Sequence, residues 1–152
     1  MLFISYKHEK GNVELIEKIV KRLKDSKYDV WFDKDKIHTG DSLTLEIEKG
    51  IKESNEVICF ITNEYIKAKN CLLEFHYASN KDKKCTYILL EPIDRDTANG
   101  VNMYLYGDAI RFDAFKHKSQ KLDDYVNVIF SEIISSINRN ESTIKSTLIS
   151  RK

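Results

Sequence analysis

The stretch EVICFIT, from Glu56 to Thr62, constrains the fold more than any other part of the chain. Its five central residues are all apolar. A strand with one face in water alternates apolar and polar residues, whereas a continuous apolar strand is typical of a parallel sheet with helices on both faces. The segment therefore predicts an α/β fold built around a buried strand.

Segments on either side of this strand alternate between strand and helix patterns. Further strands are expected at residues 2–5, 29–33 and 85–91 and around 110, and helices at residues 13–23, 43–51, 66–80 and 122–137. Such alternation with short connections favours right-handed crossovers between parallel strands. We expect one domain over residues 1–138, with a five-stranded parallel sheet flanked by helices. Residues 139–152, rich in Ser and Thr, are predicted to be a disordered polar tail or the start of a linker.

Composition argues against several classes of function. The 25 basic and 24 acidic residues leave a net charge of +1, so the positive field that nucleic-acid binding draws on is missing and no nucleic-acid partner is predicted. No apolar run approaches the roughly 18 residues of a membrane span, and the first residues do not resemble a signal peptide, so we expect a cytoplasmic protein.

The cysteines and histidines do not form a metal-ligand pattern. Cys59, Cys71 and Cys85 lack CxxC spacing, and the four histidines are far apart. We expect free thiols in a reducing compartment, with no metal site and no cofactor.

Parallel sheets bind ligands beyond the carboxyl ends of their strands, which here directs attention to residues 5–11, 33–42 and 62–74. Neither a Gly-rich phosphate loop nor a GxSxG nucleophile motif occurs in the chain. Glu74, which lies between Leu73 and Phe75, is the candidate carboxylate in these stretches.

Three stretches, in order, resemble the Toll/interleukin receptor (TIR) domain: FISYKHE at residues 3–9, YDVWFDKDKIHTGDSLTLEIEKGIKESNEVICFIT at 28–62 and NEYIKAKNCLLEF at 63–75. The resemblance implies a flavodoxin-like three-layer domain. Some members of this family recruit other TIR domains in immune signalling. Others cleave NAD⁺ at the nicotinamide–ribose bond and release nicotinamide with ADP-ribose or a cyclic isomer, in defence or cell-death signalling. The resemblance therefore implies either an NAD⁺ nucleosidase or a non-catalytic scaffold.

The NAD-cleaving members carry a glutamate at the end of a W-x-x-x-E or C-x-x-E pattern, and Cys71 and Glu74 match the second form. Asn70 stands where the tryptophan is frequent, and it could hydrogen-bond the carboxylate or a ribose hydroxyl. Residues three and four apart share one side of a helix, so Asn70 and Cys71 should lie beside Glu74. The alternative is that Glu74 is an ordinary solvated helix residue.

One carboxylate is chemically sufficient for this reaction. Glycosidases use two because an alkoxide leaving group must be protonated. Nicotinamide instead leaves NAD⁺ as a neutral ring, so a single anion beside the developing positive charge at the anomeric carbon meets the need.

The resemblance also implies substrate contacts. Trp31 matches a position where an aromatic ring lies against nicotinamide, an interaction worth about 0.5 to 2 kcal/mol as a cation–π contact; core packing within the strand is its alternative. Tyr6 and Lys7 follow the first strand, where relatives carry residues near ribose or diphosphate, and Lys7 could equally be a plain surface lysine.

The loop at residues 34–43 resembles the family's BB loop, which contacts a neighbouring domain in active assemblies. Its candidate assembly residues are Ile37, Thr39, Gly40 and Asp41. The resemblance thus implies homotypic TIR–TIR self-association, with NAD⁺ as a substrate rather than a cofactor.

Overall fold

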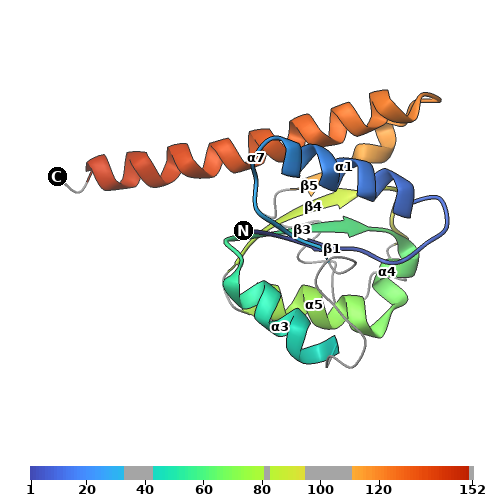
Figure 1. Ribbon diagram of the computed structural model, residues 1–152, viewed down its shortest axis with the longest axis horizontal. Helices are drawn as coiled ribbons and strands as arrows, with labels where there is room; N and C mark the ends of the chain where they lie inside the picture. The colour runs from blue at the N-terminus through green and yellow to red at the C-terminus, as the bar shows by residue number, and fades with distance from the viewer. Residues whose placement is uncertain (33–42, 81–82, 95–110, 151–152) are drawn as a thin grey trace.

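The computed structural model describes residues 1–32, 43–80, 83–94 and 111–150 (Figure 1). Within these ranges no side chain is described at residues 43–44, 70, 79–80 and 139–150. The predicted assembly residues Ile37, Thr39, Gly40 and Asp41 lie outside the described residues, so their role stays a prediction.

The described strands form one five-stranded parallel sheet in the order β2-β1-β3-β4-β5. Its strands are β1 (Leu2–Ser5), β2 (Val30–Trp31), β3 (Glu56–Ile61), β4 (Lys84–Leu89) and β5 (Arg111–Phe112). Every residue of β3 is buried, as expected for a strand covered on both faces. The predicted five-stranded parallel sheet is confirmed.

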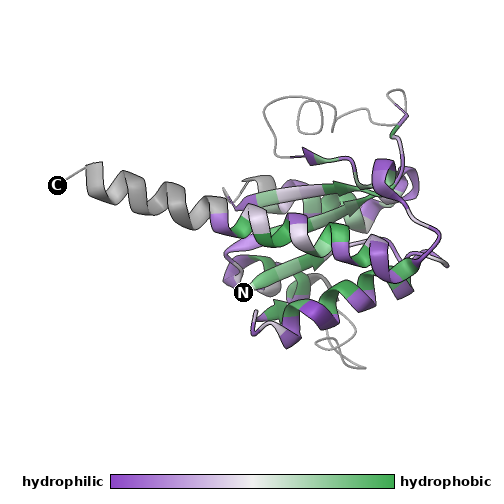
Figure 2. Cartoon of the chain, turned by 90° about the horizontal axis from the view of Figure 1, so that it is seen from above, coloured by the Kyte–Doolittle hydropathy of each residue, from purple (hydrophilic) through white to green (hydrophobic). Residues whose placement is uncertain are grey.

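Helices cover both faces of the sheet, which makes three layers (Figure 1). One face packs against α1 (Val13–Asp25) and α7 (Leu122–Ser150), and the other against α3 (Leu43–Glu53), α4 (Asn63–Lys67) and α5 (Lys69–Asn80). The short 3₁₀ helix η1 (Ala114–His117) precedes α7. Figure 2 shows the apolar strands between helices whose outer faces are polar.

Alternation along β1 divides the core into two clusters. Phe3 packs with Trp31 and Phe75 in the cluster beneath α3, α4 and α5. Ile4 packs with Ile16 in the cluster beneath α1 and α7. Because successive side chains of a strand point to opposite faces, Ser5 is placed on the same face as Phe3, and Tyr6 joins the cluster of Ile4.

Helix α1 forms because its apolar residues recur at three-and-four spacing: Leu15, Ile16, Ile19, Val20 and Leu23 are all buried. It packs beside α7, where the Arg22 guanidinium lies 4.2 Å from the centre of the Phe130 ring. An ion pair of 3.3 Å between Lys18 and Asp123 also joins the two helices.

The helix predicted over residues 66–80 is wrong in one respect, because it is two helices. Ala68 between them is extended, with φ −82° and ψ 119°. Thr62 caps the start of helix α4, since its hydroxyl accepts a hydrogen bond of 3.0 Å from the Tyr65 amide. Apolar spacing indicates which side of a segment is buried. A change of ψ at one residue hardly alters that spacing, so the break between the two helices could not be predicted from it.

The disordered tail expected after residue 138 is also wrong, since α7 continues as a helix to Ser150 and extends well past the sheet (Figure 1). Ile144 and Leu148 lie seven and eleven residues after Ile137, so the sequence continues one helical stripe that we did not recognise. Extending a formed helix also requires no new nucleation. The domain boundary near residue 138 stays a prediction.

Candidate functional site

The candidate site lies where the chain order of the strands reverses. Strand β1 has β2 on one side and β3 on the other, and Ser5 is in register with Cys59 of β3. Ligand sites in doubly wound sheets form at such a switch point, beyond the carboxyl ends of the strands. Ser5 is the last residue of β1, so its side chain lies at this edge.

Glu74 of α5 reaches the same edge. The Ser5 hydroxyl donates a hydrogen bond of 2.5 Å to Oε2 of Glu74, whose side chain is half-buried. This length is typical of a hydroxyl bonded to an ionised carboxylate. Glu74 is therefore held at the switch point and is not the fully solvated helix residue of the alternative interpretation.

A second hydroxyl completes a chain of donors. The Tyr65 Oη lies 2.6 Å from Ser5 Oγ. A serine hydroxyl has one proton to donate, and Ser5 donates it in the hydrogen bond to Glu74. The Tyr65 phenol is therefore the donor in its hydrogen bond with Ser5. The order is thus Tyr65 to Ser5 to Glu74.

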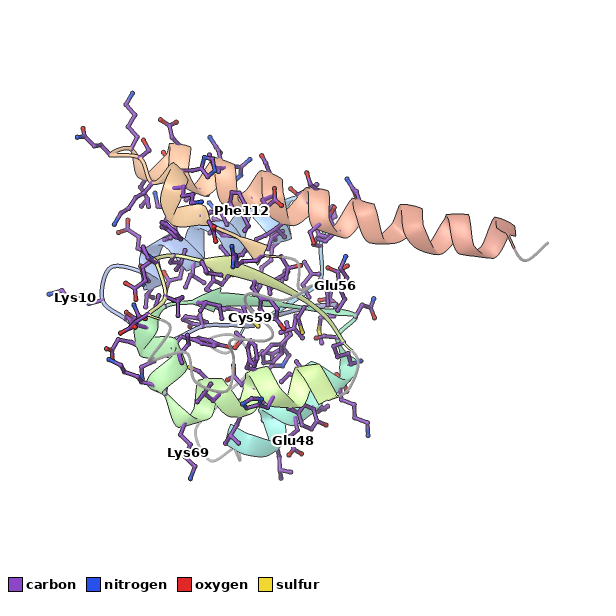
Figure 3. The ribbon with its side chains drawn as sticks, turned by 180° about the vertical axis from the view of Figure 1, so that it is seen from behind. Lys10, Glu48, Glu56, Cys59, Lys69 and Phe112 are labelled. Carbon is purple, nitrogen blue, oxygen red and sulfur yellow. The ribbon has the colours of Figure 1, made fainter. Side chains whose placement is uncertain are left out.

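Cys59 lies behind this chain, in the middle of the sheet (Figure 3), and its thiol hydrogen-bonds with Tyr65. Burial, followed by the neighbouring Cys85 thiol, raises the pKa of Cys59 well above its ordinary value. Burial also raises the pKa of Tyr65, with smaller contributions from Cys59 and the Glu74 charge. Both groups are therefore neutral near pH 7.

Cys71 makes a second link between α5 and the end of β1. Its buried thiol donates to the Tyr6 carbonyl, with 3.7 Å between sulfur and oxygen. Cys71 and Glu74 thus both contact the end of β1, in agreement with their predicted position on one side of the helix. Asn70 lies one residue earlier in α5, and its contact with NAD⁺ stays a prediction.

Trp31 lies in the hydrophobic core, one of the two environments that its position in the sequence allowed. It is 5% exposed and stacks on Phe3, with ring centres 4.6 Å apart. Gly50 of α3 approaches so closely that a Cβ there would lie 2.7 Å from the indole. A contact between this buried ring and nicotinamide stays a prediction.

Tyr6 and Lys7 are not brought to Glu74 by any described contact of their side chains. The buried Tyr6 ring stacks on Phe32 at 5.3 Å, in the cluster on the opposite face of the sheet. Its backbone carbonyl accepts the hydrogen bond from Cys71 of α5. Lys7 follows, half-buried, and its predicted role beside a phosphate remains untested.

Two other carboxylates at this edge of the sheet hold loops together. Glu9 accepts a hydrogen bond from the Thr62 hydroxyl, which joins the loops after β1 and β3. Glu91 accepts from the Asn63 amide at 2.6 Å and from its side chain at 3.1 Å, which joins the loops after β3 and β4. Glu9 and Glu91 thus join neighbouring connections to one another, whereas Glu74 joins α5 to the end of β1.

Two surface hollows lie away from Glu74. One is lined by residues at the start of α1, in the loop before α7 and in α7 itself, including Asn12, Lys118 and Tyr125. The other lies between α3 and α5, beside Leu45 and Tyr77. Among the residues that the structure describes, no cluster of His, Cys, Asp or Glu could hold a metal ion. No helix in this part of the chain is long and apolar enough to cross a membrane.

Sequence reasoning missed Ser5 and Tyr65 as members of the site. A signal was present for each: Ser5 is the polar residue that ends an apolar strand, and Tyr65 follows β3 within TNEYI. What the sequence lacked was their pairing, because they are 60 residues apart along the chain.

Comparison with known proteins agrees with this architecture. The chain is 29% identical over 82 residues to a probable 2′ cyclic ADP-D-ribose synthase, TcpO, of Methanobrevibacter olleyae, a match that covers 49% of this chain and 24% of the relative. The chain thus spans about a quarter of that protein.

Two solved structures share the fold. The TIR domains of the activated Roq1 resistosome, which directly recognises the pathogen effector XopQ, align over 87% of this chain and 98% of theirs, with a TM-score of 0.65 and 13% identity. The TIR domain of the Toll-related receptor TRR-2 of Hydra magnipapillata aligns over 91% and 97%, with a TM-score of 0.64 and 15% identity. The family model of the TIR domain matches residues 2–126. The chain therefore belongs to the TIR domain family.

Proposed function

We propose that this TIR domain is an NAD⁺ nucleosidase that cleaves the bond between nicotinamide and ribose. The observation that carries the proposal is the position of Glu74: its carboxylate lies at the switch point of the sheet, half-buried, with one oxygen bonded to Ser5. Glu74 thus lies where sheets of this kind bind their ligands.

In the proposed reaction the bond between the anomeric carbon and the ring nitrogen breaks, and its electron pair goes to nicotinamide. The pyridinium cation becomes a neutral ring, so no proton is needed for the leaving group. Positive charge develops on the ribose, where the Glu74 anion stabilises it more than it stabilises the ground state. Water then bonds to the anomeric carbon and loses a proton to give ADP-ribose. Alternatively, a hydroxyl or adenine nitrogen of the same molecule bonds there, and loss of a proton gives a cyclic isomer.

The relative from Methanobrevibacter olleyae supports this class of chemistry. Its name describes the synthesis of a 2′ cyclic ADP-ribose, and its matched segment is 29% identical to the chain. The open or cyclic nature of the product depends on which nucleophile reaches the anomeric carbon.

We further propose that activity requires self-association, through the predicted loop around Ile37, Thr39, Gly40 and Asp41, in defence or cell-death signalling in the cytoplasm. The fold of the chain resembles that of the TIR domains of a resistosome, a name that denotes an assembly, and this supports the proposed self-association. A dilute monomer should then be a weak enzyme.

The test compares nicotinamide release by the purified domain, dilute and after enforced clustering, with that of Glu74→Gln. The Gln variant keeps the size of the side chain and removes its charge, and we expect turnover to fall by roughly 10²-fold or more. Glu64→Gln is the matched control, because Glu64 lies exposed on α4 and pairs only with Lys67 at the surface among its described ion pairs. Equal release from the Glu74 and Glu64 variants, or none from the clustered wild type, would rule out the proposal.

A non-catalytic scaffold is the second candidate, and two exposed side chains favour it. Leu45 of α3 is 64% exposed and Leu73 of α5 is 55% exposed, on helices that pack against the same face of the sheet. Exposed leucines of this kind suit contact with a second TIR domain. A scaffold predicts that Leu73→Glu abolishes association and signalling while Glu74→Gln leaves both intact.

A further inference from the structure

We propose that Ser5 and Tyr65 are positioning residues that hold the Glu74 carboxylate in its working orientation. This inference rests on the proposed NAD⁺ cleavage and deepens it. Neither hydroxyl is assigned contact with the substrate; both act through the carboxylate.

Both hydroxyls lie on side chains that are buried in the domain. Ser5 is 0% exposed and lies on β1, a strand with hydrogen-bonded neighbours on both sides. Tyr65 is also 0% exposed, in a helix capped by Thr62. Each side chain is therefore confined to one position by its surroundings.

Glu74 is different, because it is half-buried on a surface helix and its side chain has three rotatable bonds. A glutamate in that setting loses substantial rotamer freedom when it is fixed. The 2.5 Å bond from Ser5 supplies the restraint on the α5 side of the sheet, and the 2.6 Å bond from Tyr65 fixes the direction of the Ser5 proton. A preorganised anion needs no reorientation as positive charge develops on the substrate.

The direction of the hydrogen bonds, from Tyr65 to Ser5 to Glu74, leads to a prediction that a general packing role would not make. In the described hydrogen bonds Tyr65 reaches the carboxylate through the Ser5 hydroxyl, so the effects of losing the two hydroxyls should not add. Once Ser5 is alanine, removal of the Tyr65 hydroxyl should cost no further turnover.

The experiment measures kcat and KM for nicotinamide release by the clustered domain and four variants. A hydrogen bond to a charged group is strong enough that Ser5→Ala should lower kcat roughly 10-fold or more, with KM nearly unchanged. Tyr65→Phe should lower kcat by a smaller factor, the double variant should match Ser5→Ala, and Ser5→Thr, which restores a hydroxyl, should recover most of the activity.

Ser136→Ala is the matched control. Ser136 of α7 is 0% exposed and shares a buried hydrogen bond of 2.9 Å with Thr86 of β4. Its loss removes a comparable buried hydroxyl pair on the opposite face of the sheet, so kcat should be unchanged. A fall in kcat for Ser136→Ala as large as that for Ser5→Ala would reduce the proposal to a general loss of packing.

Failure of this inference is distinguishable from failure of the proposed function. An active wild type whose Ser5→Ala and Tyr65→Phe variants keep full kcat would overturn the inference and leave NAD⁺ cleavage standing. An inactive wild type would overturn the function, and the crystal structure of Ser5→Ala would then decide the inference. We expect the Glu74 carboxylate to leave the strand edge in that variant, and an unmoved carboxylate would refute its positioning by Ser5.

Discussion

Gly50→Ala should destabilise the domain, although alanine is the better helix former. In a helix interior alanine is favoured over glycine by about 0.8 to 1.0 kcal/mol. At this position, however, an added Cβ would lie 2.7 to 2.9 Å from three atoms of the Trp31 indole. The indole or the helix must therefore move by about 0.7 Å before the closest contact reaches 3.4 Å, the start of ordinary van der Waals distance.

That movement is opposed by the packing of Trp31, which is 5% exposed and stacked on Phe3. Overpacking of a buried site costs about 1 to 3 kcal/mol. Set against the gain in helix propensity, the net loss in the free energy of unfolding should be about 1 kcal/mol.

Urea unfolding of four proteins tests this reasoning: wild type, Gly50→Ala, Trp31→Leu and the double variant. Trp31→Leu is itself destabilising, but it removes the indole that the new methyl group would strike. In that background Gly50→Ala should stabilise the domain by about 1 kcal/mol, so the sign of its effect reverses. A Gly50→Ala that stabilises the domain equally in both backgrounds would refute the close approach of Gly50 to Trp31.

Three further predictions follow from the structure. Gly11→Ala should lower the free energy of unfolding by about 1 to 2 kcal/mol in urea unfolding, although no atom lies within 4 Å of the new Cβ, because φ is +100° there. Burial raises the folded-state pKa of Cys59 above its ordinary value of 9.0, so its stabilising contribution is complete below pH 9 and is lost as the pH rises through the folded-state pKa. In urea unfolding from pH 8 to 11 the decline should be steeper in the wild type than in Cys59→Ala, by up to about 1.4 kcal/mol per pH unit, because Tyr65 and Cys85, whose pKa values burial also raises, titrate in both proteins. Arg22→Met should cost about 0.5 to 1 kcal/mol in urea unfolding, because it removes the cation above the Phe130 ring and keeps most of the apolar stem.

Local pattern predicted most of the architecture. EVICFIT is apolar without a break, and the strand it forms is buried along its whole length, as in a sheet covered on both faces. The spacing of Leu15, Ile19 and Leu23 likewise predicted a one-sided helix, and α1 buries these residues. Such patterns can be recognised in the sequence because the periods of helix and strand are properties of the local backbone.

Local pattern was less successful where a single backbone torsion or the far end of a helix decided the outcome. The extended Ala68 divides α4 from α5, and α7 continues to Ser150 beyond the predicted end. Both errors concern element boundaries, where apolar spacing carries little information.

The sequence by itself determined the βα alternation, the parallel sheet and the position of Glu74 in the helical segment between the third and fourth strands. Only the tertiary structure decided what surrounds that carboxylate. Ser5 and Glu74 are 69 residues apart in the chain, and they meet because β1 lies beside β3 and α5 packs against the face of the sheet on which Ser5 lies. The same is true of Trp31, whose close packing against Gly50 of α3 could not be predicted from the sequence. Periodicity is set by neighbours along the chain, whereas hydrogen-bond partners and close packing are set by which elements the folded sheet brings together.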